Sequence, residues 1–274
     1  MAVINTNVAS INAQRNLSSS AGQLSTALQR LSSGLRVNSA KDDAAGLAVA
    51  TRMQAQSRGM TVSIRNANDA ISLTQTGENA LGQMKDHLLR MRDIAVQSSN
   101  ASNNSGDRDQ LQNEFSQLQS EISRIYTQTN FNGIKILDTG SGTLSFQVGA
   151  NSGQTVDITT NNMSGMYGAV SGLSVSGTTA GSSMTAIDSI DSAITTLNSE
   201  RSVYGAAQAR FEGVVSMLQA AQENTESAIS RIMDTDYAAE TAKLTRAQIL
   251  QQAGTAMLAQ ANSIPNSVLS LLKG

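Results

Sequence analysis

Apolar residues recur at heptad spacing over two long stretches, 44–130 and 185–262, and this pattern predicts long helices. The first stretch contains two such series: Leu81, Met84, Leu88, Met91 and Ala95, then Leu111, Phe115, Leu118, Ile122 and Ile125. In the second stretch, alternating steps of four and three from Ile190 to Ile232 find apolar residues at nine of thirteen positions. Sustained heptads are typical of coiled-coil packing. As one helix, residues 44–99 would be roughly 80 Å long, which predicts a mainly α, antiparallel coiled-coil rod.

The helical pattern is interrupted within the first stretch and again between the two stretches. Small and polar residues from Ser98 to Gly106 predict a loop, with Asp107 suited to start the next helix. In 131–160 the hydrophobic period changes to two. Ile134 and Ile136, followed by Leu144, Phe146 and Val148, predict a β-hairpin closed by residues 138–142, and Gln154–Thr160 predicts a third short strand after an Asn151-Ser-Gly153 turn. Residues 160–184 are rich in Gly, Ser and Thr, which predicts an exposed loop that accepts insertions.

Both termini carry one narrow apolar seam on an otherwise polar helix pattern. The N-terminal seam is Leu17, Ala21, Leu24, Leu28, Leu31 and Leu35, and the C-terminal seam is Ala247, Leu250, Gly254, Met257, Ala261, Ile264, Val268 and Leu271. Seams this narrow bury too little apolar surface to offset the entropy of ordering some forty residues. We therefore expect both termini to be largely disordered in a free subunit and to fold against neighbouring copies.

Composition limits the possible functions. The chain has no Cys, which excludes disulfides and thiolate metal sites, and its formal net charge of −2 gives no basis for binding nucleic acid or a membrane surface. The first twenty residues show no apolar core of a cleavable signal peptide, and no run is long enough to span a bilayer. These rules alone predict a cytoplasmic protein.

The residues that catalysis would need are scarce. The single His, His87, lies off the apolar seam beside Asp86, and we interpret it as a helix-surface residue. Asp42 and Asp43 precede a predicted helix, where carboxylates can accept hydrogen bonds from free N–H groups. No nucleophile elbow, zinc-protease, phosphate-binding-loop or dinucleotide-binding motif occurs. The sequence therefore predicts neither an enzyme nor a cofactor or metal site.

Several longer motifs resemble those of bacterial flagellins. They are INTNVAS at 4–10, LSSGLR at 31–36, NSAKDDAAG at 38–46, TNFNG at 129–133, FQVGAN at 146–151 and NSIPNSVLSLL at 262–272. The resemblance covers roughly 1–160 and 185–274, nearly the whole chain. It implies a structural subunit that polymerises into the flagellar filament, is exported unfolded by the flagellar type III apparatus and is extracellular. That replaces the cytoplasmic prediction.

The resemblance also implies a domain organisation. Residues 1–43 and 237–274 would form the terminal coiled coil called D0, and 44–236 the helical rod called D1 with its β-hairpin region. Only the short 160–184 segment stands where many relatives carry further domains, so D2 and D3 are expected to be absent. The leucines of the N-terminal seam, with Leu250, Met257, Ile264, Val268 and Leu271, would be the polymerisation contacts.

The implied partners are other copies of the chain, an export chaperone, the filament cap, the hook–filament junction proteins and a host receptor. The chaperone would bind the same five C-terminal residues, from Leu250 to Leu271, by a helix-in-groove mode. Residues 88–97 resemble the segment bound by Toll-like receptor five, with Arg90, Ile94, Gln97 and Glu114 as contacts. Gln at position 89 and Glu at 93 are commoner in the family, so Leu89 and Asp93 depart from its pattern.

Two other interpretations fit parts of the sequence. A hook–filament junction protein shares similar termini, but the C-terminal SVLSLL at 267–272 and the receptor-type segment favour flagellin. An intracellular coiled-coil adaptor would share the heptads. Sedimentation after seeding with filament fragments separates these alternatives, because an adaptor stays a small oligomer whereas flagellin forms a polymer that pellets.

Overall fold

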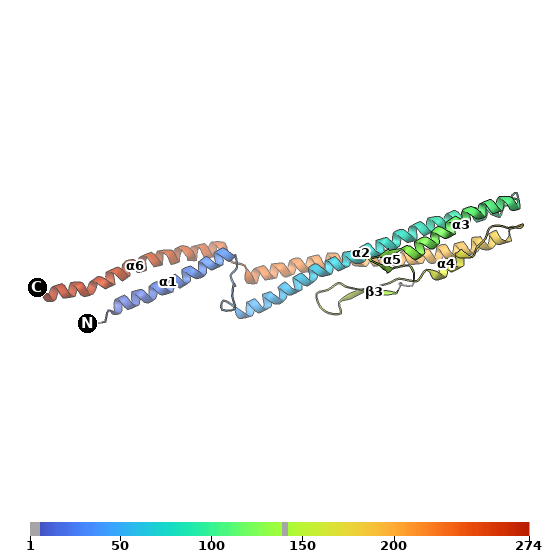
Figure 1. Cartoon of the computed structure of the whole chain (residues 1–274). Helices are drawn as coiled ribbons and strands as arrows, with labels where there is room; N and C mark the ends of the chain where they lie inside the picture. Colours follow the sequence, from blue (N-terminus) through green and yellow to red (C-terminus); the bar gives the residue numbers. More distant parts are fainter. Residues whose placement is uncertain (1–5, 139–141, 274) are drawn as a thin grey trace. The chain divides into compact units, whose positions relative to one another are not determined.

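The computed structural model describes residues 6–138 and 142–273, and side chains as far as Ser263. Helices dominate: α1 (Val8–Ser33), α2 (Ala44–Ser98), α3 (Ser105–Gln128), α4 (Ser164–Ser171), α5 (Gly181–Met233) and α6 (Tyr237–Lys273). The strands are β1 (Asn130–Phe131), β2 (Ile134–Lys135), β3 (Thr143–Gln147) and β4 (Thr155–Thr159). The predicted mainly α fold with a small β region is confirmed, as is a single helix over nearly all of 44–99 (Figure 1).

The chain forms two compact units. One contains the described residues up to Ala55 together with those from Asn224 onward, and the other is Gln56–Glu223. These boundaries fall inside α2 and α5, whereas the sequence placed the D0–D1 boundaries at the helix breaks near residues 43 and 236. The D0 and D1 assignment therefore stays a prediction.

In the unit Gln56–Glu223, α2, α3 and α5 share one hydrophobic core (Figure 1). The predicted seams supply it: Leu81, Met84, Leu88, Met91 and Ala95 of α2, Phe115, Ile122 and Ile125 of α3, and Ile190, Leu197, Tyr204 and Phe211 of α5 are all buried. Heptad spacing places these side chains on one face of each helix, so that the three faces meet without water between them.

A capping box starts α3. Asn104 accepts a hydrogen bond from the Asp107 N–H at 3.0 Å, and Asp107 accepts one from the Asn104 N–H at 3.1 Å. Asp107 thus lies at the predicted helix start but in the third helical position, because Asn104 is the N-cap. At the start of α2, Asp43 accepts from the Gly46 N–H at 2.8 Å, as expected for a helix-start carboxylate.

The predicted pairing of the first strand is wrong. Ile134 lies in β2, which pairs with β1 rather than with the Leu144–Val148 segment. The Asn132-Gly133 turn makes this possible, because both residues have positive φ, 50° and 80°, as a tight two-residue hairpin turn requires. The predicted third strand is confirmed: β4 pairs antiparallel with β3, with Phe146 opposite Val156. Part of the 138–142 turn lies outside the described residues.

The predicted surface loop at 160–184 is also wrong. Residues 164–171 form α4, and Met163, Met166, Val170 and Val175 are buried in the core shared with α3. Polar side chains of α3 fix the segment that follows. The Gln112 Oε1 accepts from the Val175 N–H at 2.6 Å, and the Gln119 Nε2 donates to the Val170 and Leu173 carbonyls at 2.8 and 3.0 Å. Met163, Met166 and Val170 follow a helical spacing of three and four and bury one face of α4, while many of the polar residues of 160–184 stay exposed.

In the other unit, α1 and α6 lie side by side and antiparallel (Figure 1). Asn7 caps α1 by accepting from the Ser10 N–H, and its side-chain amide donates to the Ala261 carbonyl at 2.7 Å. Gly34 ends α1 with a φ of 73°, and its carbonyl accepts from the Thr235 N–H at 2.9 Å. These contacts fix α1 against α6 at both ends of α1.

Candidate assembly and recognition surfaces

Small side chains form much of the contact between α1 and α6. Ala27, Ala247 and Ala261 are buried, and Gly254 lies against Leu17, where a Cβ would come within 3.2 Å of the leucine Cδ1. Close approach of the two helices therefore needs residues without large side chains at these positions. Leu17 occupies the space that Gly254 leaves, whereas several other large apolar residues of the predicted seams remain exposed.

The structure divides the predicted seam residues. Leu17, Leu24, Leu31 and Leu35 are half-buried, whereas Leu28 is 50% exposed, Leu250 47% and Met257 63%. A step of three residues turns a helix about 60° away from its starting face, so Leu250 and Met257 point away from the line that Ala247, Gly254 and Ala261 follow. Ile264, Val268 and Leu271 lie outside the residues whose side chains are described.

Several large apolar side chains of this helix pair therefore face outward. We define the outer apolar set as Val8, Ile11, Leu28, Ile249, Leu250 and Met257, each of which is 47–63% exposed. Exposed apolar residues that recur along one helix pair mark an interaction surface when they are this numerous. Val8, Ile11 and Ile249 are absent from the predicted contacts. Their spacing beside the seam was the signal that would have found them.

A second surface lies on α2 and α3. Arg90 and Glu114 form an ion pair across the two helices, with the Nη2–Oε1 distance at 2.6 Å and the Nε donating to the same oxygen at 2.8 Å. Both side chains stay about half exposed, at 53% and 45%, and Gln97 is exposed. Three of the four predicted receptor contacts are therefore accessible, and two of them contact each other.

The expected exposure of Ile94 is wrong. Its side chain is 0% exposed and belongs to the core. Because α2 packs against both α3 and α5, it buries a wider stripe than a two-helix seam would need, and Ile94 lies in that stripe beside Met91 and Ala95. The apolar residues exposed along this part of α2 are instead Leu89 (44%) and Val96 (47%), seven residues apart.

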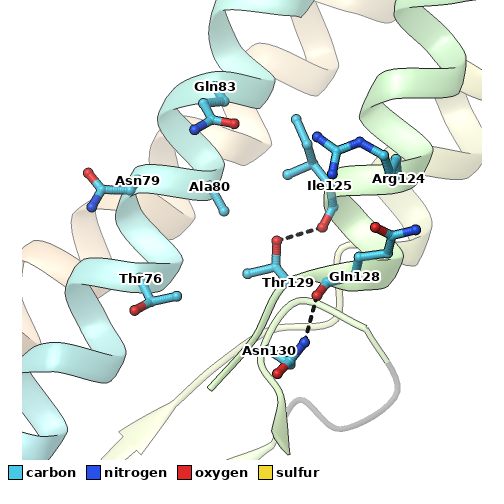
Figure 2. Close-up of a pocket in the computed structure, with 9 residues that line it drawn as sticks. All are labelled: Thr76, Asn79, Ala80, Gln83, Arg124, Ile125, Gln128, Thr129 and Asn130. Atoms are coloured by element: carbon cyan, nitrogen blue, oxygen red, sulfur yellow. Dashed lines mark hydrogen bonds between the residues drawn. The ribbon is translucent and has the colours of Figure 1, made fainter. Parts of the chain in front are cut away.

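A polar groove lies between α2 and the end of α3 (Figure 2). It has a volume of ≈ 420 Å³, and carboxamides dominate its lining: Asn79, Gln83, Gln128 and Asn130. The Thr129 hydroxyl donates to the Ile125 carbonyl at 2.6 Å, and the Asn130 amide donates to the Gln128 carbonyl at 2.8 Å. The only charged side chain in the lining is Arg124, and it is paired with Glu121. Carboxamides and hydroxyls can bind polar groups, but they are neither acids, bases nor activated nucleophiles.

Two of the carboxylates with a perturbed pKa belong to ion pairs with arginines. The hydrogen bond from Arg124 lowers the pKa of Glu121, and the hydrogen bonds from Arg92 lower the pKa of Asp191. Both carboxylates are solvent-exposed partners of an arginine rather than groups poised for proton transfer. Within the described ranges, no three His, Cys, Asp or Glu side chains cluster to hold a metal ion, and no helix is long and apolar enough to cross a membrane.

Comparison with known proteins identifies the family. The bacterial flagellin N-terminal helical region matches residues 4–142, and the bacterial flagellin C-terminal helical region matches residues 187–272. A flagellin of Halalkalibacterium halodurans is 45% identical over 273 residues, covering 99% of this chain and 100% of the relative. A flagellin of Xenorhabdus nematophila is 41% identical over 310 aligned positions, with 99% of each chain covered.

One solved structure agrees with this assignment, and a second shares the fold. The crystal structure of Bacillus cereus flagellin matches 56% of this chain and 88% of its own, with 34% identity and a TM-score of 0.50. A putative flagellar hook-associated protein from Vibrio parahaemolyticus shares the fold, with a TM-score of 0.59 over 70% of this chain, at 12% identity. The chain belongs to the bacterial flagellin family.

Family membership fixes the broad function. The chain is a structural protein, not an enzyme, and it self-polymerises into the filament of the bacterial flagellum, which is extracellular. The predictions of family, fold class and filament function are confirmed. The cytoplasmic location that composition alone predicted is wrong, because the amphipathic helices of this chain build an extracellular polymer rather than a soluble intracellular protein.

Proposed function

We propose that subunits polymerise through the α1–α6 pair, with the outer apolar set as the principal contact. The observation that carries this proposal is the exposure of six large apolar side chains on a helix pair whose mutual contact uses small residues. Burying one exposed Leu or Met stabilises an interface by about 1.5–3 kcal/mol. In this arrangement residues 1–43 and 237–274 act as the terminal domain D0 and residues 44–236 as D1. Leu17 and the half-buried Leu24 and Leu31 support the pair from within, whereas Leu35 follows α1 and packs with Val37 and Met233.

Seeded elongation tests this proposal. Leu250→Gln should slow the addition of subunits to filament fragments, because it places a polar amide where an apolar contact forms. Leu89→Gln is a matched control: Leu89 has a similar exposure, 44% against 47%, and lies on α2. Sedimented mass against time is the measurement. Equal elongation rates for the two variants would remove Leu250 from the assembly contact.

We also propose that the chain is exported through the flagellar type III apparatus, with a chaperone that covers the same surface beforehand. An exposed apolar helix that must not aggregate before export needs a partner, and a chaperone groove can cover Leu250 and Met257 together with Ile264, Val268 and Leu271. Calorimetry with the purified chaperone should give weaker binding for the double change Leu250→Gln and Met257→Gln. Unchanged affinity would exclude these residues from the chaperone contact. The filament cap and the junction proteins would meet the same helices at the ends of the polymer.

Host recognition is a second proposed function. The surface of α2 and α3 that carries Arg90, Gln97 and Glu114 would bind Toll-like receptor five, and the accessible Arg90–Glu114 pair favours this proposal. The guanidinium keeps several N–H donors free to reach a partner, since an arginine has five. Leu89 and Val96 would supply the apolar contact first expected from Ile94.

A cell reporter for the receptor tests this second proposal. Arg90→Ala should weaken signalling by the monomer while helicity by circular dichroism stays unchanged, because Arg90 is exposed and its ion pair contributes little stability. Arg58→Ala is the control, since Arg58 is exposed on the same helix and lies outside the proposed surface. Full potency of the Arg90 variant, or no signal from the parent chain, would contradict recognition at this site.

A further inference from the structure

A hollow beside the α1–α6 pair gathers positive charge. Its volume is ≈ 550 Å³, and Arg30, Lys41, Lys243 and Arg246 line it together with a single acid, Glu240. Arg30 comes from α1, Lys41 from the segment before α2, and the other two cations from α6. Four basic side chains against one acid give the lining a formal charge of +3.

The one carboxylate of the lining is already engaged. Glu240 is 4% exposed, and its Oε2 accepts from the Lys243 Nζ at 2.9 Å while its Oε1 lies 3.8 Å from the Arg30 Nη1. Hydrogen bonds from the N–H groups of Ser39 and Asn38, and to a smaller extent the charge of Arg30, lower the pKa of Asp42. Among the described residues, neither Lys41 nor Arg246 is in an ion pair with any acid.

Arg30 is only partly satisfied by its protein neighbours. Its Nε is buried and has no hydrogen-bond partner, and it is the one such side-chain atom identified among the described residues. The side chain as a whole is 24% exposed, and its one acidic neighbour in the lining, the Glu240 Oε1, lies 3.8 Å from the Nη1. The guanidinium therefore has hydrogen-bonding capacity that the protein does not use. The Gln23 amide and the Thr26 hydroxyl also line the hollow and offer further polar contacts.

The excess of positive charge on α1 and α6 is a further reason to expect that an anion binds there. The sequences of α1 and α6 contain five Lys or Arg and only one acid, Glu240, whereas the whole chain has 21 acids and 19 bases. Copies of a cationic helix pair repel one another when assembly brings them together in a medium of low dielectric constant. This step rests on the proposed assembly through α1 and α6. A bound anion at each pair would reduce the repulsion.

We propose that this hollow is an oxyanion site, which binds a phosphate or carboxylate group between Arg30, Lys41, Lys243 and Arg246. Guanidinium and ammonium groups from separate segments converge there, as the tetrahedral or planar oxygens of such groups require. The oxyanion comes either from solution, as a free phosphate-like ion, or from an acidic side chain of a second copy of this chain.

Titration with inorganic phosphate tests the site. Calorimetry on sheared filaments, in which α1 and α6 are packed, at low and constant ionic strength against chloride, should show one saturable phosphate site per chain. The double change Lys41→Gln and Arg246→Gln should weaken binding about tenfold or more while leaving the Arg30–Glu240–Lys243 contacts intact. Arg15→Gln with Arg52→Gln removes the same charge from two exposed positions outside the hollow, and should leave affinity unchanged.

The result that would overturn the site is absence of saturable binding, or equal weakening in both double variants. Seeded elongation in millimolar phosphate, at constant ionic strength, distinguishes the two possible sources of the oxyanion. If a carboxylate of a second copy occupies the hollow, phosphate competes and slows elongation; if the ion is free, phosphate speeds elongation or leaves it unchanged. Failure of assembly through α1 and α6 would appear as normal elongation of the Leu250→Gln variant, and would leave phosphate binding by its filaments unaffected.

Discussion

Gly77 and Gly82 lie on the same helix, yet their surroundings differ. A Cβ on Gly77 would lie 2.8 Å from the Cε1 atom of Tyr204, a buried ring, whereas a Cβ on Gly82 would meet nothing within 4 Å. Ala is favoured over Gly in a helix by about 0.5–1 kcal/mol, and overpacking a core costs about 1–3 kcal/mol. Gly77→Ala should therefore lower the free energy of unfolding in urea, and Gly82→Ala should raise it. Stabilisation by both changes would show that the Tyr204 ring moves aside freely.

Tyr204 itself should make stability depend on alkaline pH. Burial, and then the negative charge of Glu200, raise the pKa of Tyr204, and its hydroxyl donates to the Ile136 carbonyl at 3.3 Å. Because the folded pKa lies above the unfolded value near 10, this contribution is complete below about pH 10 and is lost above it, at up to about 1.4 kcal/mol per pH unit.

The Tyr204→Phe variant isolates this effect. At pH 8 it should be less stable than the parent by about 1 kcal/mol, because the Ile136 carbonyl loses its donor. Between pH 10 and 11 the difference should shrink or reverse, since the variant has no phenol to ionise. Urea unfolding at each pH is the measurement. If the difference in unfolding free energy between the two proteins stays constant with pH, the Tyr204 hydroxyl ionises as readily in the folded state as in the unfolded state.

Single residues also show which side-chain positions can be predicted from the sequence and which cannot. The buried leucines and methionines of α2 could be predicted, because a heptad places them on one face whatever that face meets. Ile94 could not be placed from that seam alone, since its burial depends on α2 having two partner helices, and the number of partners is a tertiary property. The exposure of Leu89 and Val96 follows from the same geometry.

At the scale of elements, one buried arginine fixes the segment that joins α4 to α5. Arg108 is 4% exposed, and its guanidinium donates to the carbonyls of Ser98 at 3.0 Å and Gly177 at 3.2 Å. Arg108→Met should lower the free energy of unfolding by about 2–4 kcal/mol, because buried carbonyls lose a charged donor. Arg210→Met, at an exposed position on α5, should change it by less than about 0.5 kcal/mol. Equal small losses would mean that water replaces the guanidinium.

The hydrogen bond from Arg108 to the Gly177 carbonyl also affects whether the chain tolerates an insertion there. An epitope placed next to Gly177 should destabilise the chain, because it displaces the carbonyl that accepts from Arg108. It also strains the hydrogen bond that the Val175 N–H donates to Gln112 and the one that Gln119 donates to Val170. This expectation differs from the tolerance that Gly-rich composition suggests. Composition describes intrinsic flexibility, whereas three polar side chains on α3, separated from the segment by more than fifty residues, determine its order.

The strands were predicted correctly in part, and one strand partner was missed. Alternation predicted β3 and β4 because period two is a local property that survives in any sheet. The partner of β2 was missed although Phe131-Asn-Gly-Ile134 contains the strongest short hairpin signal, an Asn-Gly pair between apolar residues. Here the information was present in four residues, and the longer Leu144–Val148 alternation competed with it.

For the molecule as a whole, the central claim is that polymerisation buries the outer apolar set of α1 and α6. Seams at both termini predicted that these helices belong together, and their pairing is observed. The sequence could not show which seam residues would stay outside the pair, because Ala and Gly at the contact line leave the larger side chains no space there. The disorder expected of these termini in a free subunit stays a prediction.

Thiol accessibility in monomer and filament tests the central claim most directly, because the chain has no native cysteine to interfere. Met257→Cys and Met184→Cys form a matched pair: both methionines are on helices and their exposures are 63% and 61%. A thiol reagent should modify both variants rapidly as monomers. In filaments, modification at position 257 should slow by about tenfold or more, while modification at position 184 should be far less affected. Equal, rapid modification of position 257 in monomer and filament would contradict assembly through this surface.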